Sequence, residues 1–410
     1  MEAAQKTPAL RADFSGVKMI NLKKIEPLNK EFLEQIGFAW HTDADNSDYV
    51  ADEIVEVSDE QAQAYYEAAN ELYDMFVAAA QHIIDNNLFH EVGIPFNLID
   101  LIKDSWEDEV HWHLYGRFDL AGGLDGKGIK LIEFNADTPT AVFETAIIQW
   151  AMLKFNKMDE SSQFNDLYTA LVENFKRLVV LNGDTADFSK YYEGWKILFS
   201  SVAGSIEDEN TTKLLQSAAS EAGFTTDFAY VDEVEFSDEN GIFKGDENFE
   251  YWFKLVPWED IAIKEGELAL ILKNIVENQK AIILNPAYTL LFQSKGILKI
   301  LWDLYPNHPL LLETSNEPIV GKKCVKKPIF GREGENVSII EANGEVSSQN
   351  SGIYGSNSAV YQEFYEFNKD AKEQSYQAGV FFAYESCALG FRRGGEIIDN
   401  TSKFVGHYIK

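Results

Sequence analysis

The sequence predicts an α+β fold in which antiparallel sheets are combined with one βαβ lobe, and three stretches support this prediction. Residues 116–135, GRFDLAGGLDGKGIKLIEFN, are typical of two short strands joined by a glycine-rich turn. Residues 195–231 run from a buried strand through a helix closed by Gly223 to a second strand, which indicates a βαβ unit. Residues 375–410 alternate in the manner of a closing antiparallel sheet.

The strongest helix signal lies in residues 58–87. Ser58 and Gln61 fit a capping box, and Tyr65, Leu72 and Phe76 recur at helical spacing, which indicates core packing. We expect a helical N-terminal region over residues 1–110. The main body should then span residues 111–410, with the βαβ lobe at about residues 190–235.

The remaining elements follow from local patterns. Residues 137–155 predict a helix with Thr138 as N-cap and Pro139 at the first helical position. Residues 249–261 and 280–292 are aromatic-rich strand candidates. Residues 293–314 predict a helix that breaks at Tyr305 and Pro306, and residues 324–340 predict a strand, a glycine loop and a strand.

The composition is that of a globular protein. The 410 residues are 45% hydrophobic, and no apolar run approaches the roughly 18 residues of a membrane span. The N-terminal stretch lacks a hydrophobic signal core, and Cys324 and Cys387 are too few for a disulfide framework, so we expect a cytoplasmic protein. The net charge of -32 argues against nucleic acid as a partner. This negative charge either simply keeps the protein in solution or attracts a cationic substrate.

The 116–135 hairpin carries an unusual set of polar side chains. Residues two apart on a strand share a face, so Arg117 and Asp119 should point one way. Glu133 and Asn135 should share a face as well, and Asp137 is a candidate to join them. Two carboxylates and an amide oxygen are ligands that Mg²⁺ prefers, and an arginine beside them can clamp a phosphate. Ordinary ion pairs on a solvated face remain the alternative.

Two further segments are candidate anion sites. A helix that starts near Thr138 would offer free N–H groups to an anion, with the hydroxyls of Thr138 and Thr140 beside them; simple capping is the alternative. Gly331 and Gly334 bracket a loop after Lys326 and Lys327, and such loops can fold over phosphate oxygens. A plain hairpin turn explains this loop equally well.

His111 and His113 lie two residues apart, a spacing compatible with a transition-metal site. The sequence offers no third ligand beside them, so two structural histidines are the simpler interpretation.

Six blocks in one order carry a resemblance to a known family: YGRFDL, EFNADTPTAVFETA, NPAYTLLFQSKGILKILWDLYPNHPLLLET, KKPIFGREGENV, AVYQEFYEF and GFRRGGEIIDNTSKFVGH. They resemble the glutathionylspermidine synthetase family of ATP-grasp ligases, from about Tyr49 to the C-terminus. The resemblance implies an ATP-grasp fold, with antiparallel sheets and flanking helices around a nucleotide cleft. It also implies a phosphate lid at about residues 320–345.

The resemblance assigns roles by position. It implies ATP and Mg²⁺ as cofactors and the following residues: Asp119, Glu133 and Asn135 for the metal; Lys295, Lys327, Gly331, Gly334, Gln362 and Glu363 for ATP; Arg117 and Arg392 for catalysis; Thr138 and Thr140 for the substrate. Lys295 is singled out by the resemblance alone. For the C-terminal arginine, the register leaves Arg392 and Arg393 open.

The implied activity is that of an ADP-forming carboxylate–amine ligase that works through an acyl phosphate. Glutathione or a similar peptide is the implied acid, and spermidine or another amine is its partner. The chain has no cysteine before Cys324, so the Cys-His amidase of the two-domain members is not predicted. A different peptide and amine pair, or a non-catalytic nucleotide-binding module, remain alternatives. The expected partners are small molecules, not nucleic acid or membrane, and a homodimer is compatible with the resemblance.

Overall fold

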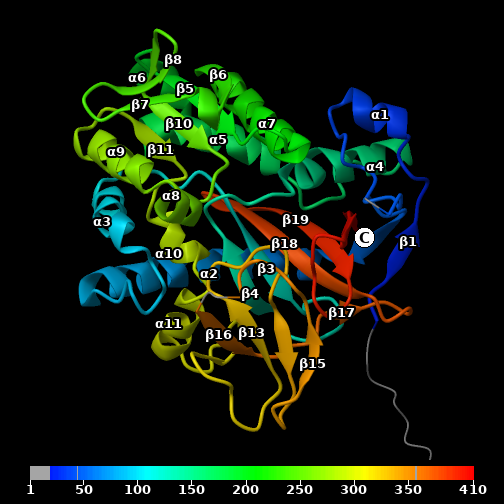
Figure 1. The fold of residues 1–410 in the computed structure, drawn as a ribbon. Helices are drawn as coiled ribbons and strands as arrows, with labels where there is room; N and C mark the ends of the chain where they lie inside the picture. Colours follow the sequence, from blue (N-terminus) through cyan, green and yellow to red (C-terminus); the bar gives the residue numbers. More distant parts are fainter. Residues whose placement is uncertain (1–18, 44, 356–357) are drawn as a thin grey trace, which may run out of the picture.

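The 116–135 hairpin lies in the middle of the molecule, within a six-stranded sheet (Figure 1). The computed structural model describes residues 19–43, 45–355 and 358–410. This sheet has the order β20-β19-β18-β3-β4, with β17 paired to β18. Its strands are antiparallel and comprise β3 (Gly116–Ala121), β4 (Lys130–Asn135), β17 (Asn368–Lys369), β18 (Ser375–Ala383), β19 (Glu385–Gly394) and β20 (Lys403–Val405). The predicted hairpin and the predicted antiparallel tail are both confirmed.

A second antiparallel sheet lies below the first in Figure 1 and has the order β12-β16-β13-β14-β15. Its strands are β12 (Thr314–Ser315), β13 (Cys324–Pro328), β14 (Ser338–Ile340), β15 (Val346–Gln349) and β16 (Ala359–Glu363). The glycine-rich segment 329–337 joins β13 to β14. We call this segment the 329–337 loop.

The predicted βαβ lobe forms a parallel sheet of order β11-β10-β5-β6, seen at the upper left of Figure 1. Its strands are β5 (Lys196–Ser201), β6 (Thr225–Tyr230), β10 (Tyr251–Lys254) and β11 (Ile282–Leu284). Its helices are α5 (Leu167–Val180), α6 (Phe188–Tyr191), α7 (Ile206–Ala222), α8 (Trp258–Lys264) and α9 (Gly266–Glu277). Gly223 ends α7 with a φ of 110°, a left-handed conformation that suits glycine. A small antiparallel sheet of β7 (Glu235–Ser237), β8 (Gly241–Lys244) and β9 (Glu247–Phe249) sits beside it.

The N-terminal part contains helices and also strands. The helices are α1 (Lys30–Gln35), α2 (Asp59–Asn86), a 3₁₀ turn (Phe96–Leu98) and α3 (Ile99–Glu107). The strands β1 (Leu22–Lys24) and β2 (Glu53–Val57) form a sheet with β21 (His407–Ile409) from the far end of the chain. The capping box of Ser58 and Gln61 at the start of α2 is confirmed. A boundary at residue 110 remains a prediction.

Four local predictions differ from the structure. The helix after β4 does not start at Thr138: helical backbone begins at Val142, followed by a π-helical turn (Glu144–Ile148) and α4 (Gln149–Phe155). Ala141 has a φ of 63°, and the carbonyls of Pro139 and Thr140 are taken by Tyr115 and Arg117. The left-handed backbone at Ala141 and these tertiary hydrogen bonds hold residues 139–141 outside helical geometry.

The strand candidates 249–261 and 280–292 are each only partly strand. β10 ends at Lys254 and α8 follows, and β11 ends at Leu284 and is followed by α10 (Thr289–Gln293). Apolar runs do not distinguish buried strand from buried helix. The next helix, α11 (Ile297–Leu304), has Tyr305 as its C-cap, which agrees with the predicted break, but the predicted helix does not resume in the described residues after Pro306.

The hairpin separates an apolar face from a polar face. Phe118 and Phe134 stack at 3.8 Å between ring centroids, and Phe76 of α2 meets them at 5.8 and 5.2 Å. All three are at most 2% exposed. Because side chains alternate along a strand, burying these phenylalanines against α2 turns the charged residues of the hairpin to the opposite face.

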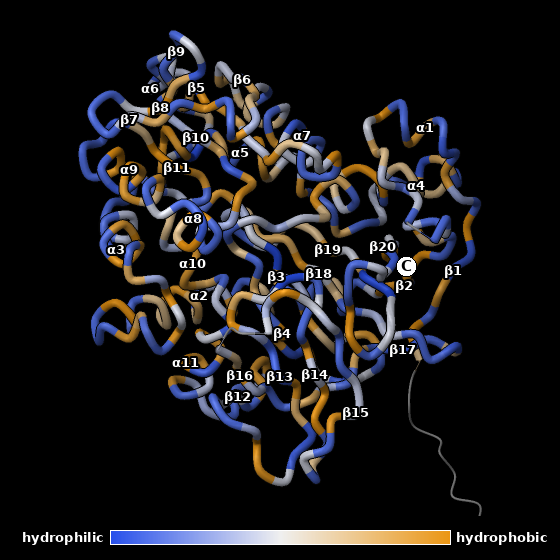
Figure 2. Tube along the Cα trace, in the orientation of Figure 1, coloured by the Kyte–Doolittle hydropathy of each residue, from blue (hydrophilic) through white to orange (hydrophobic). Residues whose placement is uncertain are grey.

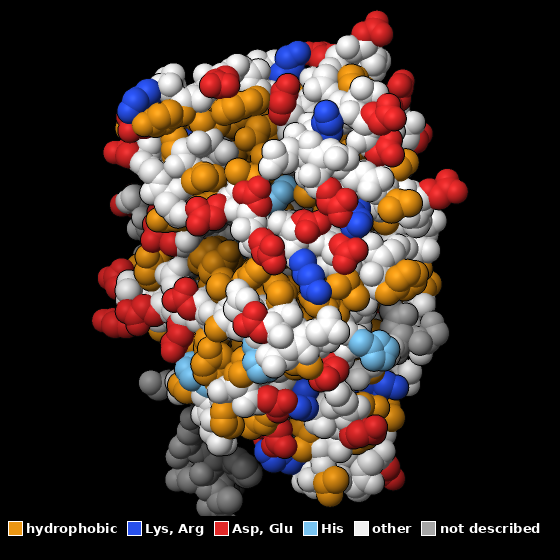
Figure 3. All heavy atoms as spheres, turned by 90° about the vertical axis from the view of Figure 1, so that its left-hand side faces the viewer, with side chains coloured by type: hydrophobic (Ala, Val, Ile, Leu, Met, Phe, Trp, Pro, Cys, Tyr) orange, Lys and Arg blue, Asp and Glu red, His pale blue; other side chains and the backbone are white. Residues whose placement is uncertain are grey.

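The outer surface carries hydrophilic loops and many acidic side chains among hydrophobic ones (Figure 2 and Figure 3). Figure 2 shows hydrophilic loops around β7 at the periphery of the lobe. Figure 3 shows acidic side chains spread over the face that carries α3 and α9. Within the described residues, none of the helices combines the length and the apolar character needed to traverse a bilayer.

Candidate active site

The polar face of the hairpin brings the predicted metal-binding residues together. Asp119 pairs with Glu133 across the two strands, and Arg117 pairs with Asn135. Arg117 grips the Asp119 carboxylate with two bonds, Nε to Oδ1 at 2.7 Å and Nη2 to Oδ2 at 3.0 Å. The Asn135 amide nitrogen donates to the same Oδ2 at 3.0 Å. Two side chains, one from each strand, therefore converge on the Asp119 carboxylate.

Two lysines from distant parts of the chain complete this cluster. Lys295 precedes α11, and its Nζ lies 3.2 Å from Glu133 Oε2 and donates to the Gly331 carbonyl at 2.7 Å. Lys327 on β13 donates to Gln362 Oε1 at 2.7 Å and to the Ile132 carbonyl at 3.1 Å. Both lysines are 5% exposed. Charged side chains of the six-stranded sheet and of the five-stranded sheet therefore meet in one cluster.

The charges in this cluster shift one another's pKa values. Burial raises the pKa of Glu133, but Lys295 and Lys327 outweigh burial and hold it below its usual value. Burial lowers the pKa of Lys327 to about 8, and Lys295 adds to this effect while Glu133 opposes it. Lys327 is therefore a cation that can lose its proton just above neutral pH.

The 329–337 loop covers the cluster from the side of the five-stranded sheet. Gly334 has a φ of 68°, and a Cβ there would lie 2.6 Å from the Ile398 carbonyl oxygen, so glycine is required by conformation and by space. Arg332 of the loop donates to Thr138 Oγ1 at 3.0 Å and to Glu259 Oε1 at 2.7 Å. The loop is thereby tied to the segment that follows β4 and to α8.

The structure distinguishes the two C-terminal arginines. Arg392 faces the cavity and donates to the carbonyls of Asp399 and Ser402 at 2.8 and 3.1 Å. Arg393 points to the other face of β19 and pairs with Glu53 at 2.9 Å. Arg392 therefore lies with the other predicted residues, and Arg393 does not.

Asp137, the sequence candidate for the Glu133 and Asn135 face, lies elsewhere. It is 1% exposed and accepts hydrogen bonds from Lys254 Nζ and from the Trp258 backbone N–H, each at 2.8 Å. The chain has left β4 at Asn135, so the two-residue period no longer applies at residue 137. The expectation that Asp137 shares their face is wrong.

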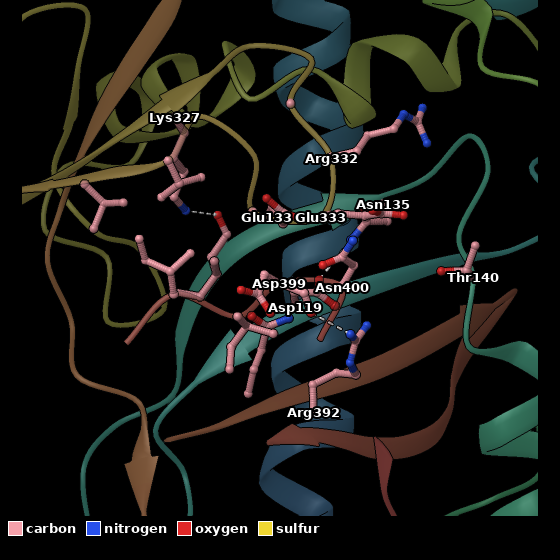
Figure 4. Close-up of a pocket in the computed structure, with 18 of the residues that line it drawn as sticks. Asp119, Glu133, Asn135, Thr140, Lys327, Arg332, Glu333, Arg392, Asp399 and Asn400 are labelled. Atoms are coloured by element: carbon pink, nitrogen blue, oxygen red, sulfur yellow. Dashed lines mark hydrogen bonds between the residues drawn. The ribbon is translucent and has the colours of Figure 1, made fainter. Parts of the chain in front are cut away.

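A single cavity of about 350 Å³ gathers the predicted site (Figure 4). All thirteen predicted site residues line it: Arg117, Asp119, Glu133, Asn135, Thr138, Thr140, Lys295, Lys327, Gly331, Gly334, Gln362, Glu363 and Arg392. Their individual roles remain predictions. In Figure 4 the Asp119, Glu133 and Asn135 side chains lie between Lys327 on one side and Arg392 on the other.

The donor set of the hairpin suits a hard divalent cation. Asp119 and Glu133 supply carboxylate oxygens, and Asn135 uses its nitrogen toward Asp119, which leaves its amide oxygen for a metal. Two carboxylates and an amide leave further coordination positions to water and phosphate, as Mg²⁺ prefers. Among the residues that the structure describes, no group of three His, Cys, Asp or Glu residues could hold a metal, so an all-acidic or thiolate cage is absent there.

His113 does not extend this donor set. It is 5% exposed, and its ring nitrogens lie 3.2 Å from the Tyr73 hydroxyl and 3.1 Å from the Ala136 carbonyl. Burial lowers its pKa to about 4, which keeps the ring neutral.

Several cavity residues were missed by the sequence interpretation. Arg332 and Glu333 lie in the quoted glycine loop, and a cation inside such a loop is a usable signal. Glu207 at the start of α7 and Trp40 and Tyr49 from the N-terminal part had no local signal. Burial raises the pKa of Glu207 to about 8, with Glu144 and Asp208 adding to it and Arg392 opposing it.

Comparison with known proteins places this arrangement in context. Residues 20–410 match the family model described as glutathionylspermidine synthase preATP-grasp. A Haemophilus influenzae protein with the provisional name acid–amine ligase is 29% identical over 401 residues, which cover 93% of this chain and 98% of that protein.

Two longer relatives match over part of their length. The bifunctional glutathionylspermidine synthetase/amidase of Escherichia coli is 24% identical, with 75% of this chain and 51% of that protein covered. Trypanothione synthetase of Crithidia fasciculata is 24% identical, with 83% and 54% covered. The chain therefore spans about half the length of these two relatives.

Among solved structures, a glutathione synthetase-like effector from Globodera pallida matches with a TM-score of 0.56 at 9% identity, covering 95% of this chain and all of the other. At this identity the likeness shows the fold alone. It agrees with the predicted α+β, ATP-grasp-related fold.

Proposed function

The chain belongs to the glutathionylspermidine synthase family, whose members are ADP-forming carbon–nitrogen ligases, and from this premise we propose that it joins a peptide-like carboxylate to an amine through an acyl phosphate. It is an ATP-dependent amide ligase that acts on small molecules with a divalent metal ion. Mg²⁺, the acyl phosphate and the identity of both substrates are the proposed parts. The supporting observation is that the residues predicted to bind the metal, the phosphates and the carboxylate all line one cavity.

The phosphates of ATP would lie between the six-stranded sheet and the five-stranded sheet. Lys295, Lys327 and Arg117 all line the same cavity. Phosphoryl transfer depends mainly on positioning and charge neutralisation. These three cations would supply both by binding the phosphates and neutralising their negative charge. Gln362 and Glu363 at the end of β16 line the cavity and would meet the base and the ribose.

A Mg²⁺ ion would be held by Asp119, Glu133 and Asn135, and it would neutralise charge on the phosphates. Arg117 keeps Asp119 oriented. The acid substrate would bind next to this group, with its carboxylate near Arg392 and the hydroxyls of Thr138 and Thr140. The 329–337 loop would exclude water, which protects an acyl phosphate from hydrolysis.

The amine would enter on the acidic side of the cavity. Glu333 and Asp399 line it, and neither forms an ion pair with a described Lys or Arg side chain. Carboxylates without a cationic partner favour a positively charged substrate. The net charge of -32 acts in the same direction over a longer range.

Coupled ADP release tests the proposal. Purified protein would receive ATP and Mg²⁺ with glutathione and spermidine, singly and together, followed by mass spectrometry. ADP formed only with both, with a dehydrated conjugate, is the expected result for that pair. ADP without a conjugate would call for a panel of other peptides and amines. Nucleotide binding with no turnover across that panel would favour the non-catalytic module.

Nucleotide affinity should fall as the pH rises from 7 to 9. Lys327 loses its proton as the pH passes about 8 in the free protein, and an uncharged amine no longer attracts phosphate. Binding should therefore take up a proton near pH 8, which calorimetry in two buffers of different ionisation enthalpy measures. The Lys327→Gln variant should lose this uptake; an unchanged uptake in the variant would contradict the assignment.

A further inference from the structure

Arg332 connects the 329–337 loop to the βαβ lobe. Its Nη2 and Nε both donate to Glu259 Oε1, at 2.7 and 3.3 Å, and its Nη1 donates to Thr138 Oγ1 at 3.0 Å. In Figure 4 its side chain extends from the loop to the side of the cavity opposite Lys327. The guanidinium group has five N–H donors, so two of them remain for a group inside the cavity.

Glu259 is held in place independently of the loop. It lies in the first turn of α8, and the preceding residue, Trp258, donates its backbone N–H to Asp137. Asp137 in turn pairs with Lys254 at the end of β10. The start of α8 is therefore anchored to the segment that follows β4, next to Thr138.

Within the described part of the chain, the Glu259 carboxylate forms no side-chain hydrogen bond that would stabilise α8 itself. It is 4% exposed, and its Oε2 has no hydrogen-bond partner among the described residues. A buried carboxylate with an unpartnered oxygen lowers stability. All of the side-chain hydrogen bonds that it forms within this part of the chain go to Arg332.

We propose that Glu259 is a positioning residue that keeps the 329–337 loop closed over the cavity by holding Arg332. The loop has a second tether, the Lys295 bond to the Gly331 carbonyl, but that tether comes from the phosphate side. Glu259 secures the opposite side, where Thr138 lies and the acid would bind. Without Glu259, the guanidinium would lose its charged partner in a buried setting and would move toward solvent, carrying the loop with it.

The consequence for catalysis rests on the proposed function. A loop that opens on the acid side would admit water to the acyl phosphate. Glu259→Gln should then raise the ratio of ADP to conjugate severalfold, with a smaller change in the KM for ATP.

Hydrogen exchange of residues 329–337 in the full-length protein tests the proposal without any substrate. In Glu259→Gln the exchange should be at least about tenfold faster than in the wild type, the factor expected for one hydrogen bond to a charged group. Arg332→Gln should give the same acceleration. The double variant should add less than about twofold to either one, because both act through a single contact.

Glu341→Gln is the matched control. It removes the same kind of carboxylate from an exposed pair with Lys323 at 3.0 Å, just after β14, and it should leave loop exchange unchanged. Normal exchange in Glu259→Gln, additive effects in the double variant, or an equal acceleration in Glu341→Gln would each overturn the proposal. Absence of ligase activity would instead overturn the proposed function, since the exchange experiment does not depend on turnover.

Discussion

Replacing Glu133 with alanine is expected to reduce metal-dependent ADP release by at least about a hundredfold, the loss typical of a group that stabilises developing charge. Glu133 is both a proposed metal ligand and the carboxylate nearest to Lys295, at 3.2 Å. Steady-state ADP release, at ATP and Mg²⁺ concentrations that saturate the wild type, measures the effect. Raising the Mg²⁺ concentration should recover part of the activity if the ligand set is merely weakened.

Glu133 is a cleaner test than Asp119. Removing Asp119 would leave Arg117 without its bidentate partner and would disturb the hairpin. Lys295 keeps its bond to the Gly331 carbonyl when Glu133 is shortened. The control is Glu366→Ala, which removes a half-exposed carboxylate outside the cavity. Wild-type turnover in Glu133→Ala would show that the hairpin does not supply the metal ligands.

The Asp137→Leu variant is expected to lose about 3–5 kcal/mol of stability, the cost of breaking a buried ion pair. Asp137 and Lys254 have fully buried side chains, with Nζ and Oδ1 2.8 Å apart. Burial raises the pKa of Asp137, and Lys254 and the Trp258 N–H oppose that rise. Within the described residues, losing Asp137 would leave the Lys254 ammonium group with the Val256 carbonyl as its hydrogen-bond acceptor and with the Trp258 ring, whose centroid is 4.4 Å away. The urea midpoint of unfolding measures the loss.

Two further variants distinguish the loss of a buried ion pair from the loss of a charge in general. Asp227→Leu removes a similar partner of Lys244 at 2.6 Å, but that pair is about 40% exposed and should contribute no more than about 1 kcal/mol. Adding Lys254→Met to Asp137→Leu should restore most of the stability, because an apolar pair can replace a buried ion pair. A double variant no more stable than Asp137→Leu would argue against this account.

The hairpin shows how far sequence periodicity can predict a site. Alternation along β3 and β4 placed Arg117 with Asp119 and Glu133 with Asn135, and the register pairs these residues across the strands. A strand has a fixed two-residue period, so its faces can be assigned without knowing the rest of the fold. The same rule failed at Asp137, where the strand had ended.

Segments that leave a strand or start a helix were less predictable. Thr138 and Pro139 have the residue types of a helix start, but tertiary hydrogen bonds to Tyr115 and Arg117 take the carbonyls on which that helix would depend. The segment after Leu284 was predicted as strand and forms α10. A local preference of a few tenths of a kcal/mol is easily outweighed by such contacts.

The sequence was sufficient for the α+β class, for the polar face of the hairpin and for the glycine loop, because each depends on a local period or a local residue type. It could not place Lys295 against Glu133, since the two residues are 162 positions apart in the chain and only the packing of α10, which directly precedes Lys295, against β4 brings them together. The choice of Arg392 over Arg393, and the bond from Arg332 to Glu259, likewise depend on which face of a strand or loop meets another element. Contacts of this kind are set by the packing of elements distant in sequence, and no local pattern in the chain encodes them.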